Sequence, residues 1–112
     1  YKNRFLVRSG EQILSVPVED ITFLIAEDGI VLLVNKEGKR FALDQSLDTL
    51  ETLLDPKHFF RISRKVTIRF EAIRKIMPHL NSRLKVFSEF LNEGESTVSR
   101  ERVSEFKQWL DR

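Results

Sequence analysis

Short apolar runs alternate with compact turn sequences through the first half of the chain, and this alternation restricts the fold more than any other feature. The runs are rich in Val, Ile, Leu and Phe and occupy residues 4–8, 12–16, 21–26, 30–35 and 39–43. Tight turns such as Ser9-Gly10-Glu11 and Glu27-Asp28-Gly29 separate them, because glycine tolerates the positive φ that a short hairpin needs. No helix lies between consecutive runs, as it would in a parallel sheet. The pattern predicts antiparallel hairpins, with the run at 21–26 in a central strand.

Two segments have a helical period instead. In the first, Ser46 precedes leucines at positions 47, 50, 53 and 54, which share one face of a helix. Ser46 is the expected N-cap, and Asp55-Pro56 is expected to end this helix. The second helix closes the chain after Ser99, its expected cap. Its apolar face consists of Val103, Phe106, Trp109 and Leu110.

Shorter strands are expected between and after these features. The alternation of Val66 and Ile68 predicts a strand at 65–69, and the preceding Phe59-Phe60 pair reads as part of the core. A hairpin is expected from 73–77 and 84–87, followed by a last strand at 96–98. With about nine or ten short strands in all, the predicted fold class is mostly β. It has small antiparallel sheets, a mid-chain helix and a C-terminal helix.

Length and composition fit one globular domain. The chain has 112 residues, 41% of them hydrophobic and 32% charged, which suffices for a single core. No apolar run approaches the roughly 20 residues of a membrane-spanning helix, and no signal peptide is expected. The absence of cysteine excludes disulfides and agrees with a cytoplasmic location. From its length we interpret residues 1–112 as a single domain. Met77 is the only methionine, so the sequence has no initiator, and we interpret it as a fragment of a longer protein.

Positive charge is concentrated in one segment. Residues 57–85 contain nine Lys and Arg side chains and one acidic residue, Glu71, whereas residues 1–56 and 86–112 are net acidic. The whole chain has a formal net charge of only +2. Such clustering predicts a basic surface, and the usual partner of a basic surface is a polyanion.

The stretch Phe59-Phe60-Arg61-Ile62-Ser63-Arg64 stands within this basic segment. Three further features accompany it: the helix start Ser46-Leu47-Asp48-Thr49-Leu50, the run Ile73-Arg74-Lys75-Ile76, and Val98-Ser99-Arg100 before the last helix. In this order and spacing they resemble a LytTR-type DNA-binding domain, from about Arg8 to Leu110.

The resemblance implies the C-terminal output domain of a bacterial two-component response regulator, which follows a receiver domain and controls transcription. Such domains read double-stranded DNA with loop side chains inserted into successive major grooves, without a recognition helix. The resemblance also implies binding at paired direct repeats. Two copies are then expected side by side on one site, an arrangement that allows a dimer on the DNA.

Family contact positions transfer to two residues of this chain. The polar residue after the Phe-Arg element corresponds to Arg64, and the arginine of the closing Ser-Arg pair corresponds to Arg100. A third family contact lies before the strand that begins near Ile30. Because Asp28-Gly29-Ile30 offers no donor there, we expect that contact to be lost or moved to Asn35 or Lys36. The chain also departs from the family pattern in the basic strand, at Lys65, Val66, Ile68 and Arg69.

Guanidinium groups suit DNA recognition because they form paired bonds with guanine O6 and N7 or with a phosphate. We therefore expect Arg64 and Arg100 to contact base edges or the adjacent phosphates. For each cation the alternative is a solvated charge or an ion pair, and Arg61 has the alternative of bracing the sheet against an acid such as Asp55. The expected backbone contacts are Arg61, Lys65, Arg69, Arg74 and Lys75, with Ser63 as a hydroxyl donor.

Two other functions are weighed against DNA binding. An enzyme would need a phosphate loop, a nucleophile elbow or a metal site, and the chain has no such motif. The only histidines, His58 and His79, have no cysteine to join them, so no metal or cofactor is expected. A non-catalytic basic β module that binds RNA or a protein partner is the remaining alternative. Readers of single-stranded RNA present aromatic side chains for stacking, whereas the Phe residues here are spaced mostly as core residues.

Overall fold

The computed structural model describes residues 1–112 and contains ten strands and two α-helices. The strands are β1 (Arg4–Ser9), β2 (Gln12–Pro17), β3 (Ile21–Glu27), β4 (Ile30–Asn35), β5 (Arg40–Leu43), β6 (Phe59–Arg61), β7 (Val66–Arg69), β8 (Lys75–His79), β9 (Arg83–Phe87) and β10 (Thr97–Val98). The helices are α1 (Leu47–Leu53) and α2 (Val103–Leu110), and 3₁₀ turns occupy Val18–Asp20, Phe70–Ala72, Glu93–Glu95 and Arg100–Arg102. The predicted fold class is confirmed.

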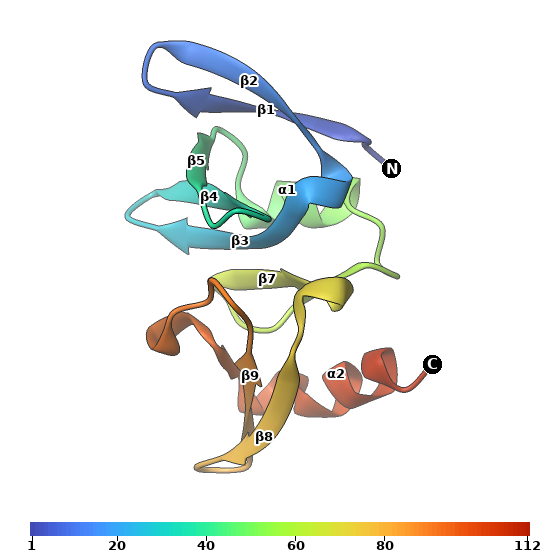
Figure 1. The fold of residues 1–112 in the computed structure, drawn as a ribbon. Coiled ribbons are helices and arrows are strands. Elements are labelled where there is room, and N and C mark those ends of the chain that lie inside the picture. The colour runs from blue at the N-terminus through green and yellow to red at the C-terminus, as the bar shows by residue number, and fades with distance from the viewer.

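All strand pairs are antiparallel, and they form two sheets (Figure 1). The first sheet has seven strands in the order β2-β1-β5-β4-β3-β7-β6, and the second has three in the order β10-β9-β8. In Figure 1 the two sheets follow each other along the long axis of the molecule, with α1 beside the first and α2 beside the second. The run at 21–26 lies in β3, which has a paired strand on each side, as predicted.

Strand β3 is continuously apolar because both of its faces are buried. Leu24 belongs to one core, where Leu50 of α1 packs, whereas Phe23 and Ile25 belong to a second core, where Phe106 of α2 packs. Successive side chains of a strand point to opposite faces, so a strand covered on both sides has no polar alternation. One strand thus contributes to both hydrophobic cores.

Helix α1 has the predicted N-cap. The Ser46 hydroxyl accepts a hydrogen bond from the Thr49 N–H (3.2 Å). A cap of this kind contributes about 1 kcal/mol to helix stability. Leu47 and Leu50 of the helix are buried, as is Leu54 directly after it. The predicted apolar face of this helix therefore packs on the first core.

The structure corrects three local predictions. Phe59 is buried and Phe60 packs on the second core, as predicted, but Phe59–Arg61 also forms an edge strand paired with β7, which its three residues are too few to reveal in the sequence. Strand β8 lies two residues later than predicted because the hairpin turn is shorter than expected: Asn81 and Ser82, with φ of 59° and 61°, let His79 pair with Arg83, and the same register pairs Lys75 with Phe87. Ser99 does not cap the last helix through its side chain, since its hydroxyl donates to the Ile62 carbonyl oxygen (3.3 Å).

Two contacts connect the β4–β5 region of the first sheet to residues beside the second sheet. The guanidinium of Arg40 in β5 donates two bonds to the carboxylate of Glu95, near β10 (3.1 and 3.2 Å). Hydrogen bonding to Glu95 raises the pKa of Arg40 above its ordinary value. Gly38, in the β4–β5 turn, lies against the ring of Phe90, which packs on the second core. A Cβ at this position would lie 2.6 Å from the ring, so the contact needs glycine.

Replacing Gly38 with alanine should lower the free energy of unfolding more than the same change at Gly29. The two glycines have similar positive φ (86° and 82°), and only at Gly38 would the new Cβ meet a neighbour, the Phe90 ring. The backbone conformation costs an alanine about 1–2 kcal/mol in both variants. Urea unfolding of the two variants isolates the Phe90 contact, because this shared cost cancels. Equal losses of stability would show that the ring moves aside freely.

Candidate nucleic-acid interface

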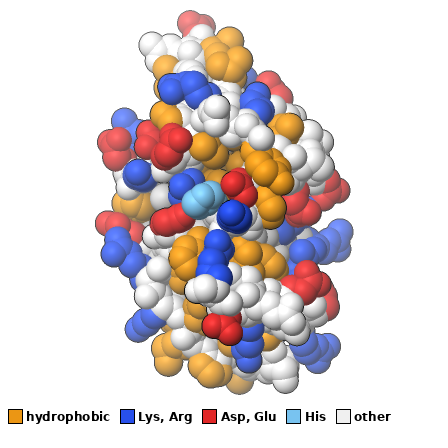
Figure 2. All heavy atoms as spheres, turned by 90° about the vertical axis from the view of Figure 1, so that its right-hand side faces the viewer, with side chains coloured by type: hydrophobic (Ala, Val, Ile, Leu, Met, Phe, Trp, Pro, Cys, Tyr) orange, Lys and Arg blue, Asp and Glu red, His pale blue; other side chains and the backbone are white.

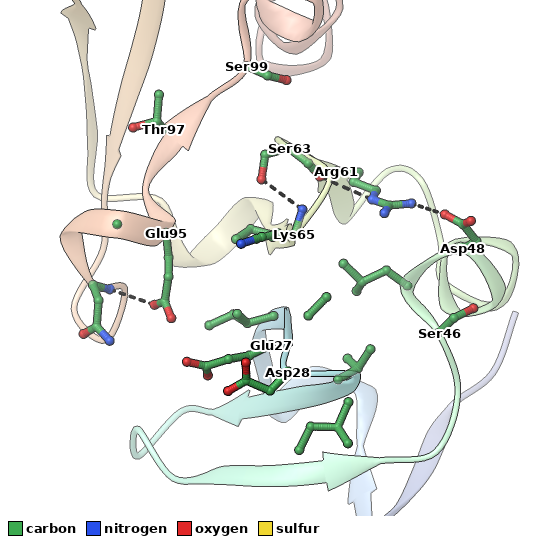
Figure 3. Close-up of a pocket in the computed structure, with 18 of the residues that line it drawn as sticks. Glu27, Asp28, Ser46, Asp48, Arg61, Ser63, Lys65, Glu95, Thr97 and Ser99 are labelled. Atoms are coloured by element: carbon green, nitrogen blue, oxygen red, sulfur yellow. Dashed lines mark hydrogen bonds and ion pairs between the residues drawn. The ribbon is translucent and has the colours of Figure 1, made fainter.

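Three loops that are distant in sequence meet at one open groove (Figure 3). They are the β3–β4 turn, the β6–β7 loop and the segment between β10 and α2. Backbone hydrogen bonds hold them together: the Ala26 N–H donates to the Lys65 carbonyl oxygen (2.7 Å), and the Ser99 N–H to the Ile62 carbonyl oxygen (2.9 Å). The groove has a volume of ≈ 1390 Å³, and the start of α1 and the β8–β9 turn also line it.

Arg61 holds the β6–β7 loop in shape. Its side chain is only 15% exposed. The guanidinium donates to the carbonyl oxygens of Ser63 (3.3 Å) and Arg64 (2.6 Å) and to the carboxylate of Asp48 in α1. Figure 3 shows the Arg61–Asp48 bond reaching from the loop to the helix. Arg61 therefore has a bracing role, and its acid partners are Asp48 and, at 3.7 Å, Glu51, rather than Asp55.

The same loop presents Arg64 and Lys65 to solvent. Both side chains are exposed, and neither has an acidic group within ion-pair distance. The hydroxyl of Ser63 accepts a bond from the Lys65 N–H (3.3 Å), which helps to fix the backbone beneath them. Arg100 opens the last 3₁₀ turn and is likewise exposed and unpaired. Lys65 and Arg100 thus place unpaired cations on two of the three loops that line the groove, whereas Arg64 stands beside Lys65 and is not one of the lining residues.

A further cation of the groove, Arg83, is not among the residues predicted from the sequence. It directly follows the β8–β9 turn, and its Nε donates to the Leu80 carbonyl oxygen (3.0 Å). It has no acidic partner, and Asn81 of the same turn also lines the groove. Arg83 belongs to the basic segment 57–85, and that composition is the only sequence signal that could have suggested it as a contact. The fold then brings this hairpin tip to the groove that Arg100 also lines.

Acidic side chains share the groove with these cations. In Figure 3, Glu27 and Asp28 of the β3–β4 turn lie below Lys65, and Glu95 lies to one side. Carboxylates repel phosphate groups, so the groove is not a uniformly basic path. The turn at Asp28-Gly29-Ile30 has no side chain that can donate a hydrogen bond. It therefore offers no residue for the DNA contact that the family pattern has at this turn.

Asn35 lies at the opposite end of the β3–β4 pair, where its register partner is Ile21. Its side-chain oxygen accepts hydrogen bonds from the N–H groups of Glu37 and Lys39 (2.9 Å each). Lys36 pairs with an acid there, at 3.7 Å. The structure therefore gives Asn35 a role in the β4–β5 turn and does not bring it into the groove.

Arg69 is also engaged inside the protein. Its side chain is 14% exposed, donates to the Val18 carbonyl oxygen (2.9 Å) and pairs with Glu71 (3.5 Å). Arg74 pairs with Glu89 (3.2 Å). Lys75 is exposed and has no acidic partner. None of these three cations lines the groove.

The segment 57–85 does not form the single basic surface that its charge predicts. Four of its nine cations pair with acids: Arg61 with Asp48, Arg69 with Glu71, Arg74 with Glu89, and Lys85 with Glu93. Figure 2 shows one face of the molecule, on which Lys and Arg side chains lie among Asp and Glu side chains around a histidine. The unpaired cations are Lys57, Arg64, Lys65, Lys75 and Arg83.

The histidines and acidic side chains do not converge on a metal site. No three His, Cys, Asp or Glu side chains lie close enough together to hold a metal ion. His58 instead bonds through Nδ1 to the carboxylate of Glu71 (2.7 Å). Neither helix has the length and apolar content needed to cross a membrane.

Comparison with known proteins identifies similar chains. The model of the LytTr DNA-binding domain family matches residues 11–111. The transcriptional regulatory protein YpdB of Escherichia coli strain K12 is 28% identical over 100 residues, 89% of this chain, and the YpdB of Shigella flexneri is equally similar. This chain spans 40% of the length of those relatives. A solved LytTr DNA-binding domain from Bacillus cereus has the same fold, with a TM-score of 0.88 over all of both chains at 22% identity.

Replacing Arg61 with glutamine should raise the pKa of Asp48 toward its ordinary value. The hydrogen bond from Arg61, together with its charge, lowers the pKa of Asp48 in the folded protein. The ion pair therefore stabilises the fold above the ordinary pKa of 3.8, and this contribution is lost as the pH falls through the lower folded-state pKa. NMR titration of the carboxyl groups measures the change. Glu93 is the internal control, since Lys85 lowers its pKa. An unchanged Asp48 would mean that Arg61 does not tie the loop to α1.

Proposed function

The chain belongs to the LytTR family of DNA-binding domains, and on that premise we propose that it binds double-stranded DNA sequence-specifically as the output domain of a bacterial two-component response regulator. One observation carries the proposal. Unpaired cations stand on two loops that a backbone hydrogen bond joins, Arg64 and Lys65 on one and Arg100 on the other. Loops braced in this way hold their side chains in one arrangement, and in this proposal the loop side chains of the domain enter successive major grooves.

Arg64 and Arg100 are the proposed base contacts. An arginine recognises guanine by donating two bonds to O6 and N7, both of which are accessible in the major groove. Lys65 and Ser63 flank Arg64, and we assign them to the adjacent phosphates, which fix the register of the protein on the duplex without reading sequence. Arg83 adds a further cation to the lining of the groove.

Three residues of the sequence-based set have other roles in this proposal. Arg61, Arg69 and Asn35 use their side chains for bonds within the protein, so they hold the loops and strands that carry the contacts. Lys75 remains a backbone contact outside the groove.

The regulatory context is a further part of the proposal. In the full-length protein a receiver domain controls this output domain, and the protein acts in the cytoplasm, where bacterial DNA lies. Two copies occupy paired direct repeats and form a dimer on the DNA. Because direct repeats orient both copies the same way, any contact between them joins two unlike surfaces.

Selection from a random duplex-DNA library, with sequencing of the retained fraction at moderate salt, tests DNA recognition directly. Enrichment of a short motif is the expected result, and a spaced repeat of that motif supports two copies per site. Retention without a motif would point to a polyanion binder that does not read sequence. Displacement of the bound duplex by competing single-stranded RNA would favour RNA as the partner. A failure to retain any duplex at low salt would overturn DNA binding.

Arg64→Ala and Arg100→Ala should each weaken binding to the selected motif by about 1–3 kcal/mol, because each removes a bidentate base contact. Binding to unrelated duplexes should weaken less, so the ratio of specific to non-specific affinity falls. Lys107→Ala is the matched control, since it removes an exposed cation of α2 outside the groove. Fluorescence anisotropy at fixed salt measures all three. If both arginine variants bind the motif as tightly as the control, neither arginine reads a base.

A further inference from the structure

The three-stranded sheet has one covered face and one open face. Ile76, Leu84 and Val86 pack on the covered face in the core that contains Phe106 of α2. Side chains alternate across a strand, so the residues between these lie on the opposite face, here called the outer face. The strand register assigns to the outer face Lys75, Met77 and His79 of β8, Arg83, Lys85 and Phe87 of β9, and Thr97 of β10.

The outer face is basic. It carries three cations and a histidine, and no residue of β8, β9 or β10 is acidic. Glu93 pairs with Lys85 at 2.9 Å, which neutralises one of the charges. Lys75 and Arg83 have no acidic partner. A net positive charge therefore remains on a partly exposed sheet surface.

An aromatic ring positions two of these charges. The ammonium groups of Lys75 and Lys85 lie 4.9 and 5.9 Å from the centre of the Phe87 ring. Attraction between a cation and the ring face restricts both flexible side chains to the outer face. An ammonium group is a compact donor that binds a phosphate oxygen as a point charge and does not depend on base sequence.

The outer face is continuous with the groove. Arg83 and Thr97 belong to both, because they line the groove and their side chains lie on the outer face. From Arg83, strand β9 leads directly to Lys85 and Phe87, with Lys75 paired beside Phe87. A duplex that leaves the groove past Arg83 therefore lies over the remaining cations of this face.

We propose that the outer face binds the phosphate backbone of the DNA that flanks the sequence-read segment. This inference rests on the proposed function, since it extends the same duplex beyond the groove. Continuity with the groove favours DNA as the occupant over an acidic protein. The contact adds affinity without adding sequence preference, because it reaches phosphates and no base edge.

The test compares Lys75→Gln with the wild type on two duplexes. One duplex is trimmed to the selected motif, and the other has about ten added base pairs on each side, enough for one further helical turn. The control is Lys57→Gln, which removes the same charge from an exposed, unpaired position outside the groove and the outer face. Thermal unfolding establishes that all three proteins are folded.

The wild type and the control should bind the extended duplex more tightly than the trimmed one, whereas the outer-face variant should bind both alike. On the extended duplex its salt slope should be shallower by about 0.9, the value for one lost phosphate contact. Between 50 and 200 mM salt, the variant should therefore lose about threefold less affinity than the wild type.

The inference would be overturned if the outer-face variant had the same salt slope as the wild type and gained as much affinity from the flanking base pairs. An equal loss of affinity on both duplexes would also overturn it, because that result would place Lys75 within the sequence-read segment. Capture of poly-glutamate by the wild type but not by the variant, with DNA binding unchanged, would assign the face to an acidic protein. Failure of the wild type to bind any duplex would overturn the proposed function itself, a result distinct from all of these.

Discussion

Burial of β3 on both faces is the constraint on which the rest of the molecule depends. Leu24 packs into the core beside α1, while Phe23 and Ile25 pack into the core beside α2. Each such side chain contributes about 1.5–3 kcal/mol when it is fully buried, so a single strand stabilises both cores at once. The same strand pairs with β4 and β7 and ends at the turn that lines the groove. The position of the candidate site relative to the cores is therefore fixed by packing.

The loops at the site support one another through their backbone polar groups. Irregular backbone needs hydrogen-bond partners when strands do not supply them. Here the Ile62 and Lys65 carbonyl oxygens accept bonds from the β10–α2 segment and from β3, and Arg61 satisfies the carbonyl oxygens of Ser63 and Arg64. A backbone held in this way loses little conformational freedom when its exposed side chains bind a partner, which lowers the entropic cost of binding.

Features that obey local rules were predictable from the sequence. The hairpins, the Ser46 cap and the two helices follow from turn chemistry and periodicity. Strand β6 was not predictable in this way, because its pairing with β7 alone defines it. At the site, resemblance and charge predict contacts at Arg64 and Arg100, and the fold places these two residues on joined loops. The bracing of Arg61 by Asp48 and the arrival of Arg83 at the groove depend on contacts between distant segments, which no local pattern encodes.

Charge counted along the chain overstates how basic the folded surface is. Asp48, Glu89 and Glu93 come from the acidic flanking segments, and each pairs with a cation of the basic segment. Attraction to phosphates is thereby confined to a few unpaired cations around the groove and the outer face. Non-specific affinity rises with the number of phosphates neutralised, whereas discrimination comes from base edges. In the function proposed here, internal ion pairing weakens binding to arbitrary DNA while leaving Arg64 and Arg100 available to bases, and so favours a high ratio of specific to non-specific affinity.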